Sequence, residues 1–340
     1  MAKRAHSSES DGQRLSAQIE HDSVSEILQV VRFRGMFICR SELAAPWGFR
    51  MGARDFANFH IVLTGKACLE VGADRRPLWV SAGDLIVLPH GSEHAMRDSP
   101  GSNALPLEEL IATAKSYRRG TLRAGGDGAT CVLLCGGFTF EEREANPLLA
   151  VLPAVIHLRG RRPGVDAWVR SVFDFLKRES AAGLPGAEAV ITRLADILFI
   201  EALRAYFGSP NADRPSLSAA LRDPGIGSVL ALLHRHPERH WSLATLSRQT
   251  GMSRTALATR FAERVGEPPM RYLTRCRINK AATLLRNNGA TVQQAAERGG
   301  YDFALGFSRA FKRLLGLSPA EYRRAPRLLR SDDRAPVPGR

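Results

Sequence analysis

The chain of 340 residues lacks several features that would assign it to common protein classes. No run approaches about 18 consecutive apolar residues, and the polar start has no apolar core of a signal peptide, so we expect a cytoplasmic protein without a membrane span. It has five cysteines and no Cys-x-x-Cys pair, which argues against a disulfide framework and a cysteine zinc site. The hydrophobic content of 44% still suffices for two packed domains.

What the chain does contain is an internal repeat with an offset of 50 residues between Ser242 and Arg324. The apolar and turn residues of the first copy recur in the second: Leu257, Phe261, Gly266, Pro269 and Tyr272 have counterparts in Phe307, Phe311, Gly316, Pro319 and Tyr322. A turn glycine precedes the second helix of each copy, Gly251 or Gly300. Helix, tight turn and helix is the layout of a helix-turn-helix unit, whose second helix can lie in a DNA major groove. Two such units predict a DNA-binding protein.

Positive charge is concentrated in the same region. Residues 226–324 contain 17 Lys and Arg against 6 Asp and Glu, a surplus of 11 within a formal net charge of +14 for the chain. Such a surplus neutralises phosphates and releases counterions, which strengthens DNA binding of any sequence. A basic surface without a partner would carry the same charge, so the charge favours DNA binding only in combination with the repeat.

Local signals define the helices of both units. Ser242 is a capping residue for the first helix of the first copy, and Thr291 and Gln294 form a capping box for the first helix of the second copy. Ser253 is a capping residue for a helix over about 254–264, and its outward side chains are expected to contact DNA: Arg254, Thr255, Ala258, Thr259 and Arg260. In the second copy the buried pair Phe307 and Phe311 turns another set toward the groove: Ala304, Leu305, Ser308, Arg309 and Lys312. Arg309 suits a bidentate contact to guanine, whereas Ala304 and Leu305 can only meet thymine methyls or sugars.

A long helix over 272–286 is expected to join the two units and to hold them about one DNA turn apart. It carries basic side chains that fit phosphate contacts and solvated helix charges equally well: Arg275, Arg277, Lys280 and Arg286.

The C-terminal run closely resembles a known family. Residues 295–324, AAERGGYDFALGFSRAFKRLLGLSPAEYRR, are similar to the C-terminal signature of AraC/XylS-type bacterial transcription regulators. The resemblance implies a bipartite helix-turn-helix domain over 226–324, which binds double-stranded promoter DNA and commonly contacts RNA polymerase. Phe303 departs from the pattern, where small polar residues are usual.

Short β-branched and aromatic runs between Asp22 and His157 predict a small antiparallel barrel or sandwich. Gly83, Pro89, Gly91, His94 and Asp98 match the spacing of the second cupin motif. The region therefore resembles the cupin-type sensor of one AraC/XylS subgroup, and the fold class expected is α+β multidomain, with a cupin-like barrel over 21–160 and an all-α C-terminal domain.

The metal chemistry of cupins is not expected here. The first-motif positions that carry metal ligands fall on Gly52, Arg54 and Asn58, none of which is a His or a carboxylate. His60 and His94 alone make a poor metal site, so we expect no metal or cofactor, and we assign both histidines to a hydrogen-bonded interior or to a small-molecule effector.

The cysteines Cys131 and Cys135 should share one face of a strand, where they are either packing residues or a redox-sensing pair. Apolar stripes predict helices within 161–207. These helices are either buried in the monomer or form a homodimer, which we prefer because paired half-sites suit a dimer.

Residues 208–225 are expected to be a linker, and residues 1–20 and 325–340 disordered tails. The whole predicts a transcription regulator and no enzyme, controlled by an effector or a redox signal. Two other functions remain open: a cupin enzyme with an appended domain, and an architectural DNA binder indifferent to base sequence.

Overall fold

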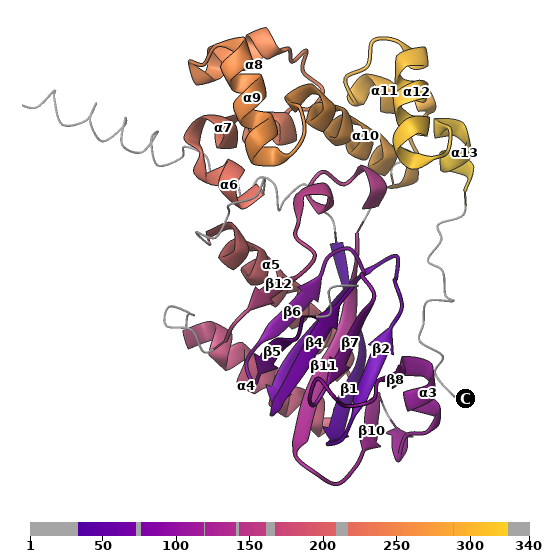
Figure 1. Cartoon of the computed structure of the whole chain (residues 1–340). Coiled ribbons are helices and arrows are strands. Elements are labelled where there is room, and N and C mark those ends of the chain that lie inside the picture. The colour runs from indigo at the N-terminus through magenta and orange to yellow at the C-terminus, as the bar shows by residue number, and fades with distance from the viewer. Residues whose placement is uncertain are drawn as a thin grey trace, which may run out of the picture. The chain divides into compact units, whose positions relative to one another are not determined.

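The computed structural model describes residues 33–72, 76–118, 120–140, 143–160, 167–208, 217–287 and 289–325 (Figure 1). These residues form two compact units. The unit that we call the strand unit comprises the described residues within 33–140 and 152–208, and the helical unit comprises those within 143–151 and 217–325. The expected tails lie outside the described residues except for Ala325.

The strand unit contains two sheets that enclose an apolar interior. The first has the strand order β12, β6, β3, β11, β1, β10, β9, and the second has the order β5, β4, β7, β2, β8. Their bounds are β1 Phe33–Ala44, β2 Gly48–Met51, β3 Ala57–Thr64, β4 Lys66–Val71, β5 Leu78–Ser81, β6 Leu85–Leu88, β7 His94–Arg97, β8 Leu105–Pro106, β9 Ser116–Arg118, β10 Thr121–Gly125, β11 Thr130–Phe140 and β12 Ile156–Leu158, with a short helix α3 at Leu107–Ala112. This confirms the expected β-rich N-terminal architecture.

Strand β3 is buried on both faces, and the alternation of its side chains explains why. Val62 belongs to the interior cluster, and Asn58 and His60 share its face by the two-residue period. On the opposite face Phe59 packs against Phe138 of β11, with ring centroids 4.9 Å apart. The sequence of β3 therefore needs cover outside the barrel as well as inside it.

Helices α4 (Ala167–Ala182) and α5 (Ala187–Gly208) supply that cover (Figure 1). Phe199 of α5 stacks on Phe138, with ring centroids 4.5 Å apart, and the Asp196 carboxylate accepts a 2.9 Å hydrogen bond from the backbone N–H of Gly35 in β1. Burial of most of α5 is thus provided within the strand unit. Val190 and Ile197 on its other side remain 38% and 44% exposed.

The helical unit contains eight helices among its described residues. They are α6 Leu217–Arg222, α7 Pro224–Arg235, α8 Leu243–Thr250, α9 Arg254–Val265, α10 Pro269–Asn287, α11 Val292–Arg298, α12 Ala304–Leu315 and α13 Pro319–Arg324. The 3-10 turn Arg143–Ala145 belongs to the same unit, and Ala145 lies in the apolar cluster of Phe307 and Phe311.

Part of the expected linker is helical. Residues 209–216 lie outside the described residues, but Leu217–Arg222 form α6, which packs against α7 and α9. Burial of Ala219 and Ala220 explains the difference, because small apolar residues let a short helix approach its neighbours closely. No helix in the described part of the chain combines the length and apolarity that a bilayer crossing requires.

Candidate nucleic-acid interface and barrel interior

The first helix-turn-helix unit consists of α8 and α9. Ser242 and Thr245 form a capping box at the start of α8, with the Thr245 N–H donating to Ser242 Oγ at 3.1 Å. Gly251 ends α8 in the left-handed conformation, at φ +67°. Ser253 then accepts a 3.1 Å hydrogen bond from the Ala256 N–H and starts α9. The caps predicted at Ser242 and Ser253 are confirmed.

Leu257 and Phe261 of α9 are fully buried, which turns the opposite face outward. Among the side chains predicted to meet DNA, Arg254, Thr255 and Thr259 are exposed, whereas Ala258 is half-buried. Ala256, which we did not predict, lies exposed in the first turn.

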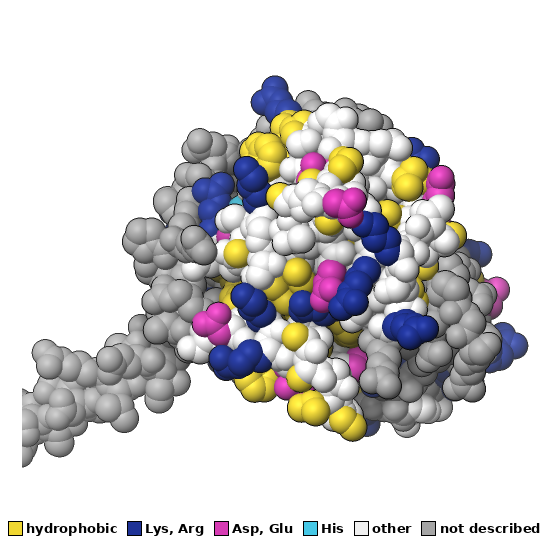
Figure 2. Space-filling view, turned by 90° about the horizontal axis from the view of Figure 1, so that it is seen from below, with side chains coloured by type: hydrophobic (Ala, Val, Ile, Leu, Met, Phe, Trp, Pro, Cys, Tyr) yellow, Lys and Arg dark blue, Asp and Glu magenta, His cyan; other side chains and the backbone are white. Residues whose placement is uncertain are grey.

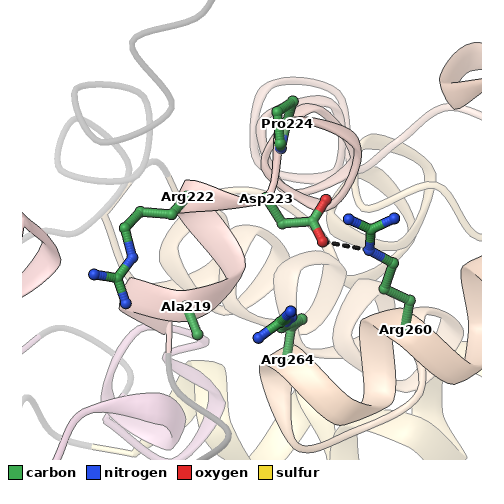
Figure 3. A pocket seen from close by; sticks show the side chains of 6 residues that line it. All are labelled: Ala219, Arg222, Asp223, Pro224, Arg260 and Arg264. Atoms are coloured by element: carbon green, nitrogen blue, oxygen red, sulfur yellow. Dashed lines mark hydrogen bonds and ion pairs between the residues drawn. The ribbon is translucent and has the colours of Figure 1, made fainter. Parts of the chain in front are cut away.

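Arg260 is exposed but already has a partner in the protein. Its guanidinium forms an ion pair with Asp223, whose carboxylate also accepts hydrogen bonds from the N–H groups of Gly225 and Ile226 and so caps α7. The pair lies in a hollow with a volume of about 290 Å³. Figure 3 shows the side chains that line it: Ala219, Arg222, Asp223, Pro224, Arg260 and Arg264. No local signal in the sequence joins Asp223 to Arg260, which lies 37 positions further along the chain.

The second unit consists of α11 and α12. Thr291 and Gln294 form the predicted capping box, and Gly300 in the turn has φ +82°. Phe303 occupies the N-cap position of α12 and makes no side-chain capping bond. Of the predicted DNA-contacting side chains in α12, Ser308 is half-buried, and the others are exposed: Ala304, Leu305, Arg309 and Lys312.

Two basic side chains of α10 hold the loop between α7 and α8. Arg277 donates to the backbone carbonyls of Pro237 and Arg239, both at 2.8 Å, and Lys280 Nζ lies 2.7 Å from a Glu238 carboxylate oxygen. We predicted phosphate contacts or solvated charges for these residues, and the structure gives them bonds inside the helical unit. They fix the first unit against the connecting helix.

The same loop also touches the turn of the second unit. A Cβ atom at Gly300 would lie 2.7 Å from Cα of Glu238, closer than real Cβ contacts allow. The two helix-turn-helix units are therefore joined by tertiary contacts as well as by α10.

Arg275, the third predicted phosphate ligand, also has a partner inside the helical unit. It donates to the buried Glu267 at 3.1 Å.

A directed chain of hydrogen bonds runs through the barrel interior. His94 Nδ1 lies 2.9 Å from the Ser92 carbonyl and must donate to it, so in the neutral ring Nε2 accepts. His60 Nε2 lies 2.9 Å from that atom and therefore donates, which leaves His60 Nδ1 to accept from the Cys135 thiol at 3.2 Å. Burial lowers the pKa of His60 well below its usual value, and the nearby His94 lowers it further. Burial likewise lowers the pKa of His94, so both rings are neutral at pH 7.

Asn58 lies beside His60 on the inner face of β3 and is 1% exposed. Neither its amide oxygen nor its amide nitrogen has a hydrogen-bond partner in the protein. A buried amide without partners is costly, so this side chain calls for a partner from outside the chain. The sequence identifies Asn58 only as a position that a cupin metal ligand would occupy.

The interior does not fit a cupin metal. Both imidazole acceptor nitrogens are engaged in the hydrogen-bond chain, and Gly52, Arg54 and Asn58 supply no anionic ligand. Within the described ranges, no cluster of three His, Cys, Asp or Glu side chains is arranged to hold a metal ion.

All five cysteines are buried, and none forms a disulfide. Cys131 and Cys135 share the interior face of β11, as expected, and the β1–β11 register places Cys39 opposite Cys135 and Leu43 opposite Cys131. Burial raises the pKa of Cys131 to about 12. The neighbouring Cys39 side chain, together with burial, raises the pKa of Cys135 well above its usual value. The raised pKa values make Cys131 and Cys135 poor nucleophiles, which favours packing over redox sensing for this pair.

Charge is mixed on the face of the molecule in Figure 2, where Lys and Arg lie among Asp, Glu and apolar side chains. That face offers no continuous basic surface for a phosphate backbone.

The helices of the second unit have exposed basic side chains of their own. They include Arg298, Arg309, Lys312 and Arg313.

Two protein families match the chain. A cupin family matches residues 22–208, more than half of the chain, and a helix-turn-helix domain family matches residues 246–325. A protein of Streptomyces lividans that carries the name of an AraC-like transcription regulator is 32% identical over 309 residues, covering 90% of this chain and 99% of that protein. The HTH-type transcriptional regulator AlkR of Acinetobacter baylyi is 28% identical over 307 residues, covering 89% of this chain and 99% of its own.

Among solved structures, the DNA-binding domain of AdpA in complex with a target DNA matches 28% of this chain and 86% of its own, at 32% identity and a TM-score of 0.27.

Proposed function

The chain belongs to the AraC-like transcription regulators, with an N-terminal cupin domain and a C-terminal helix-turn-helix region, and from this premise we propose how it acts on DNA. Helices α9 and α12 enter neighbouring major grooves of one promoter duplex, and each reads its own window of bases. The observation that carries the proposal is the connection of two complete helix-turn-helix units by α10 and by the Arg277, Lys280 and Gly300 contacts.

The exposed side chains of α9 and α12 are suited to different contacts in the two windows. In α9, Thr255 and Thr259 suit hydrogen bonds to base edges, and Arg254 suits a guanine or a phosphate. In α12, Arg309 is the side chain suited to guanine, and Lys312 lies one turn further along the helix. The side chains of Arg275, Arg277 and Lys280 form bonds inside the helical unit and stabilise the relative positions of α9 and α12.

Footprinting tests this proposal. We expect the full-length protein to protect two windows on one face of its promoter, separated by about one helical turn. In competition it should prefer that duplex over random DNA by about a thousandfold or more. Protection of a single window, or equal binding of random DNA, would refute the proposal and favour an architectural binder.

We infer that the barrel interior binds a small polar effector. The support is Asn58, which presents an unpartnered donor and acceptor beside His60 and His94. In a reporter strain, Asn58→Leu should abolish the response to the inducing condition while leaving the DNA affinity of the effector-free protein unchanged. A response equal to that of the parent protein would exclude the amide from effector binding.

We propose a homodimer formed through α5. Val190, Leu194 and Ile197 follow the i, i+4, i+7 spacing of one helix face, and two of them are among the exposed large apolar residues of the described chain. Ile197→Asp should shift the sedimentation of the protein from dimer to monomer. Leu184→Asp, at an equally apolar exposed site outside the stripe, is the matched control and should remain dimeric. A wild-type monomer at micromolar concentration would rule this out.

The regulator is proposed to act in the cytoplasm, to contact RNA polymerase at its promoter and to catalyse no reaction. The hydrogen-bonded His60 and His94 and the absence of a carboxylate at Asn58 support a sensor rather than a metalloenzyme. Stoichiometric iron or manganese in the purified protein would contradict this assignment.

A further inference from the structure

Phe303 breaks two local rules at once. It stands at the N-cap of α12, where a side-chain oxygen normally accepts a backbone hydrogen bond, and it makes no such bond. The equivalent position in the first unit is Ser253, which does cap its helix. The phenyl ring of Phe303 is also 79% exposed, the highest value among the exposed large apolar residues of the described chain. Such departures from local preference are expected where a residue serves contacts outside its own domain.

The apolar surface continues from Phe303 onto the helix. Leu305 is 64% exposed and Ala304 is exposed between them. Leu305 and Arg309 are four residues apart, so they lie on one ridge of α12, opposite the buried Phe307 and Phe311. We call Phe303, Ala304 and Leu305 the apolar tip.

The surroundings of the apolar tip distinguish DNA from a protein partner as its occupant. Exposed positive charges lie on α11 and α12, at Arg298, Arg309, Lys312 and Arg313, and outnumber the exposed carboxylates of Glu297 and Asp302 in this region. A phosphate backbone complements this surplus of positive charge, and an apolar group on a base edge complements the apolar tip. In a major groove that apolar feature is the 5-methyl group of thymine.

Resting on the proposed function, the geometry points to thymine recognition: we propose that the apolar tip packs against thymine 5-methyl groups, so that the second window is A·T-rich at these positions. The first unit has Ser253, Arg254 and Thr255 at the equivalent places and reads by hydrogen bonding instead. The two windows of one operator are thus read by different physical interactions.

The test uses the full-length protein and the duplex that it selects in vitro from a random library. Each thymine of the second window is replaced in turn by deoxyuridine, which lacks only the 5-methyl group. Loss of one buried methyl contact should weaken binding about fourfold. Phe303→Ser, which installs the capping residue of the first unit, should leave the thermal transition of the protein unchanged or raise it, yet weaken binding and remove the deoxyuridine effect.

Leu317→Ala is the matched control, since Leu317 is an exposed apolar residue beyond the C-cap of α12. It should keep both the affinity and the deoxyuridine effect. If deoxyuridine changes nothing while the selected duplex still outcompetes random DNA, thymine recognition is overturned and the proposed function stands. If Phe303→Ser keeps full affinity but loses activation with RNA polymerase in vitro, the tip contacts protein and the inference is likewise overturned. A selected duplex that binds no better than random DNA would instead refute the proposed function.

Discussion

Replacing the turn glycine of each helix-turn-helix unit separates backbone strain from tertiary packing. Gly251 and Gly300 both occupy the left-handed region, at φ +67° and +82°. An alanine there costs about 1–2 kcal/mol of stability in either unit. The two sites differ in their surroundings, because a Cβ atom at Gly251 meets nothing within 4 Å, whereas one at Gly300 lies 2.7 Å from both the Cα and the carbonyl oxygen of Glu238.

Backbone atoms cannot swing aside as a flexible side chain can, so Gly300→Ala must also displace the loop that Arg277 and Lys280 hold. Overpacking of this kind costs about 1–3 kcal/mol. We therefore expect a loss of about 1–2 kcal/mol for Gly251→Ala and about 2–5 kcal/mol for Gly300→Ala. The effect on the unfolded chain is the same in both variants and cancels in the comparison.

Equilibrium urea unfolding of the two full-length variants, followed by tryptophan fluorescence and far-ultraviolet circular dichroism, measures the difference. Footprinting provides the second readout, since a displaced Glu238 loop should weaken simultaneous protection of the two windows in Gly300→Ala. Equal destabilisation of the two variants would refute the reasoning that the turn of the second unit is packed against the first.

Three further predictions follow from single contacts. Asp223→Ala should destabilise the helical unit by about 1–3 kcal/mol in urea unfolding, because α7 loses its cap and Arg260 loses its partner. Asp223→Asn should lose less stability, because Asn also caps helices. Equal losses in the two variants would contradict the capping role. Gly306→Ala should raise stability by about 0.5–1 kcal/mol, since the new Cβ meets nothing within 4 Å. It should lower operator affinity measured by gel shift, because α12 approaches DNA at this turn in the proposed complex; unchanged affinity would place the turn away from DNA. Burial lowers the pKa of His234 to about 4. The free energy of unfolding should therefore be unaffected by the titration of His234 above about pH 6.5 and should fall by about 3 kcal/mol as the pH is lowered toward 4. The unfolding of His234→Phe should lack this part of the pH dependence, and an identical pH profile would show that His234 is not buried in its neutral form.

Much of the helical unit was predictable from short stretches of sequence. The caps at Ser242, Ser253 and Thr291 and the turn glycines depend on residues within about four positions of one another, so a linear reading finds them. The buried pair Phe307 and Phe311 likewise follows from helical periodicity. The β-rich N-terminal unit was predictable as a class, because alternation and turn residues are also local signals.

The roles of individual polar side chains were harder to predict. Arg260 and Arg277 are basic residues of the kind expected on a DNA-binding surface. Their partners in the protein, Asp223 and the Pro237–Arg239 loop, are about 40 residues away in the chain. Part of the segment expected to be a linker, 208–225, forms α6. Its helix is stabilised by burial against neighbouring helices, which lie elsewhere in the sequence.

The sequence by itself determined the two helix-turn-helix units, their caps and the family to which the chain belongs, because each of these depends on spacing along one segment. Only the tertiary structure decided which charges are bound inside the protein, that Cys135 faces Cys39 and His60, and that Asn58 is buried without a partner. Those facts depend on strand register and helix packing, which bring together residues whose separation in the sequence contains no signal of their contact.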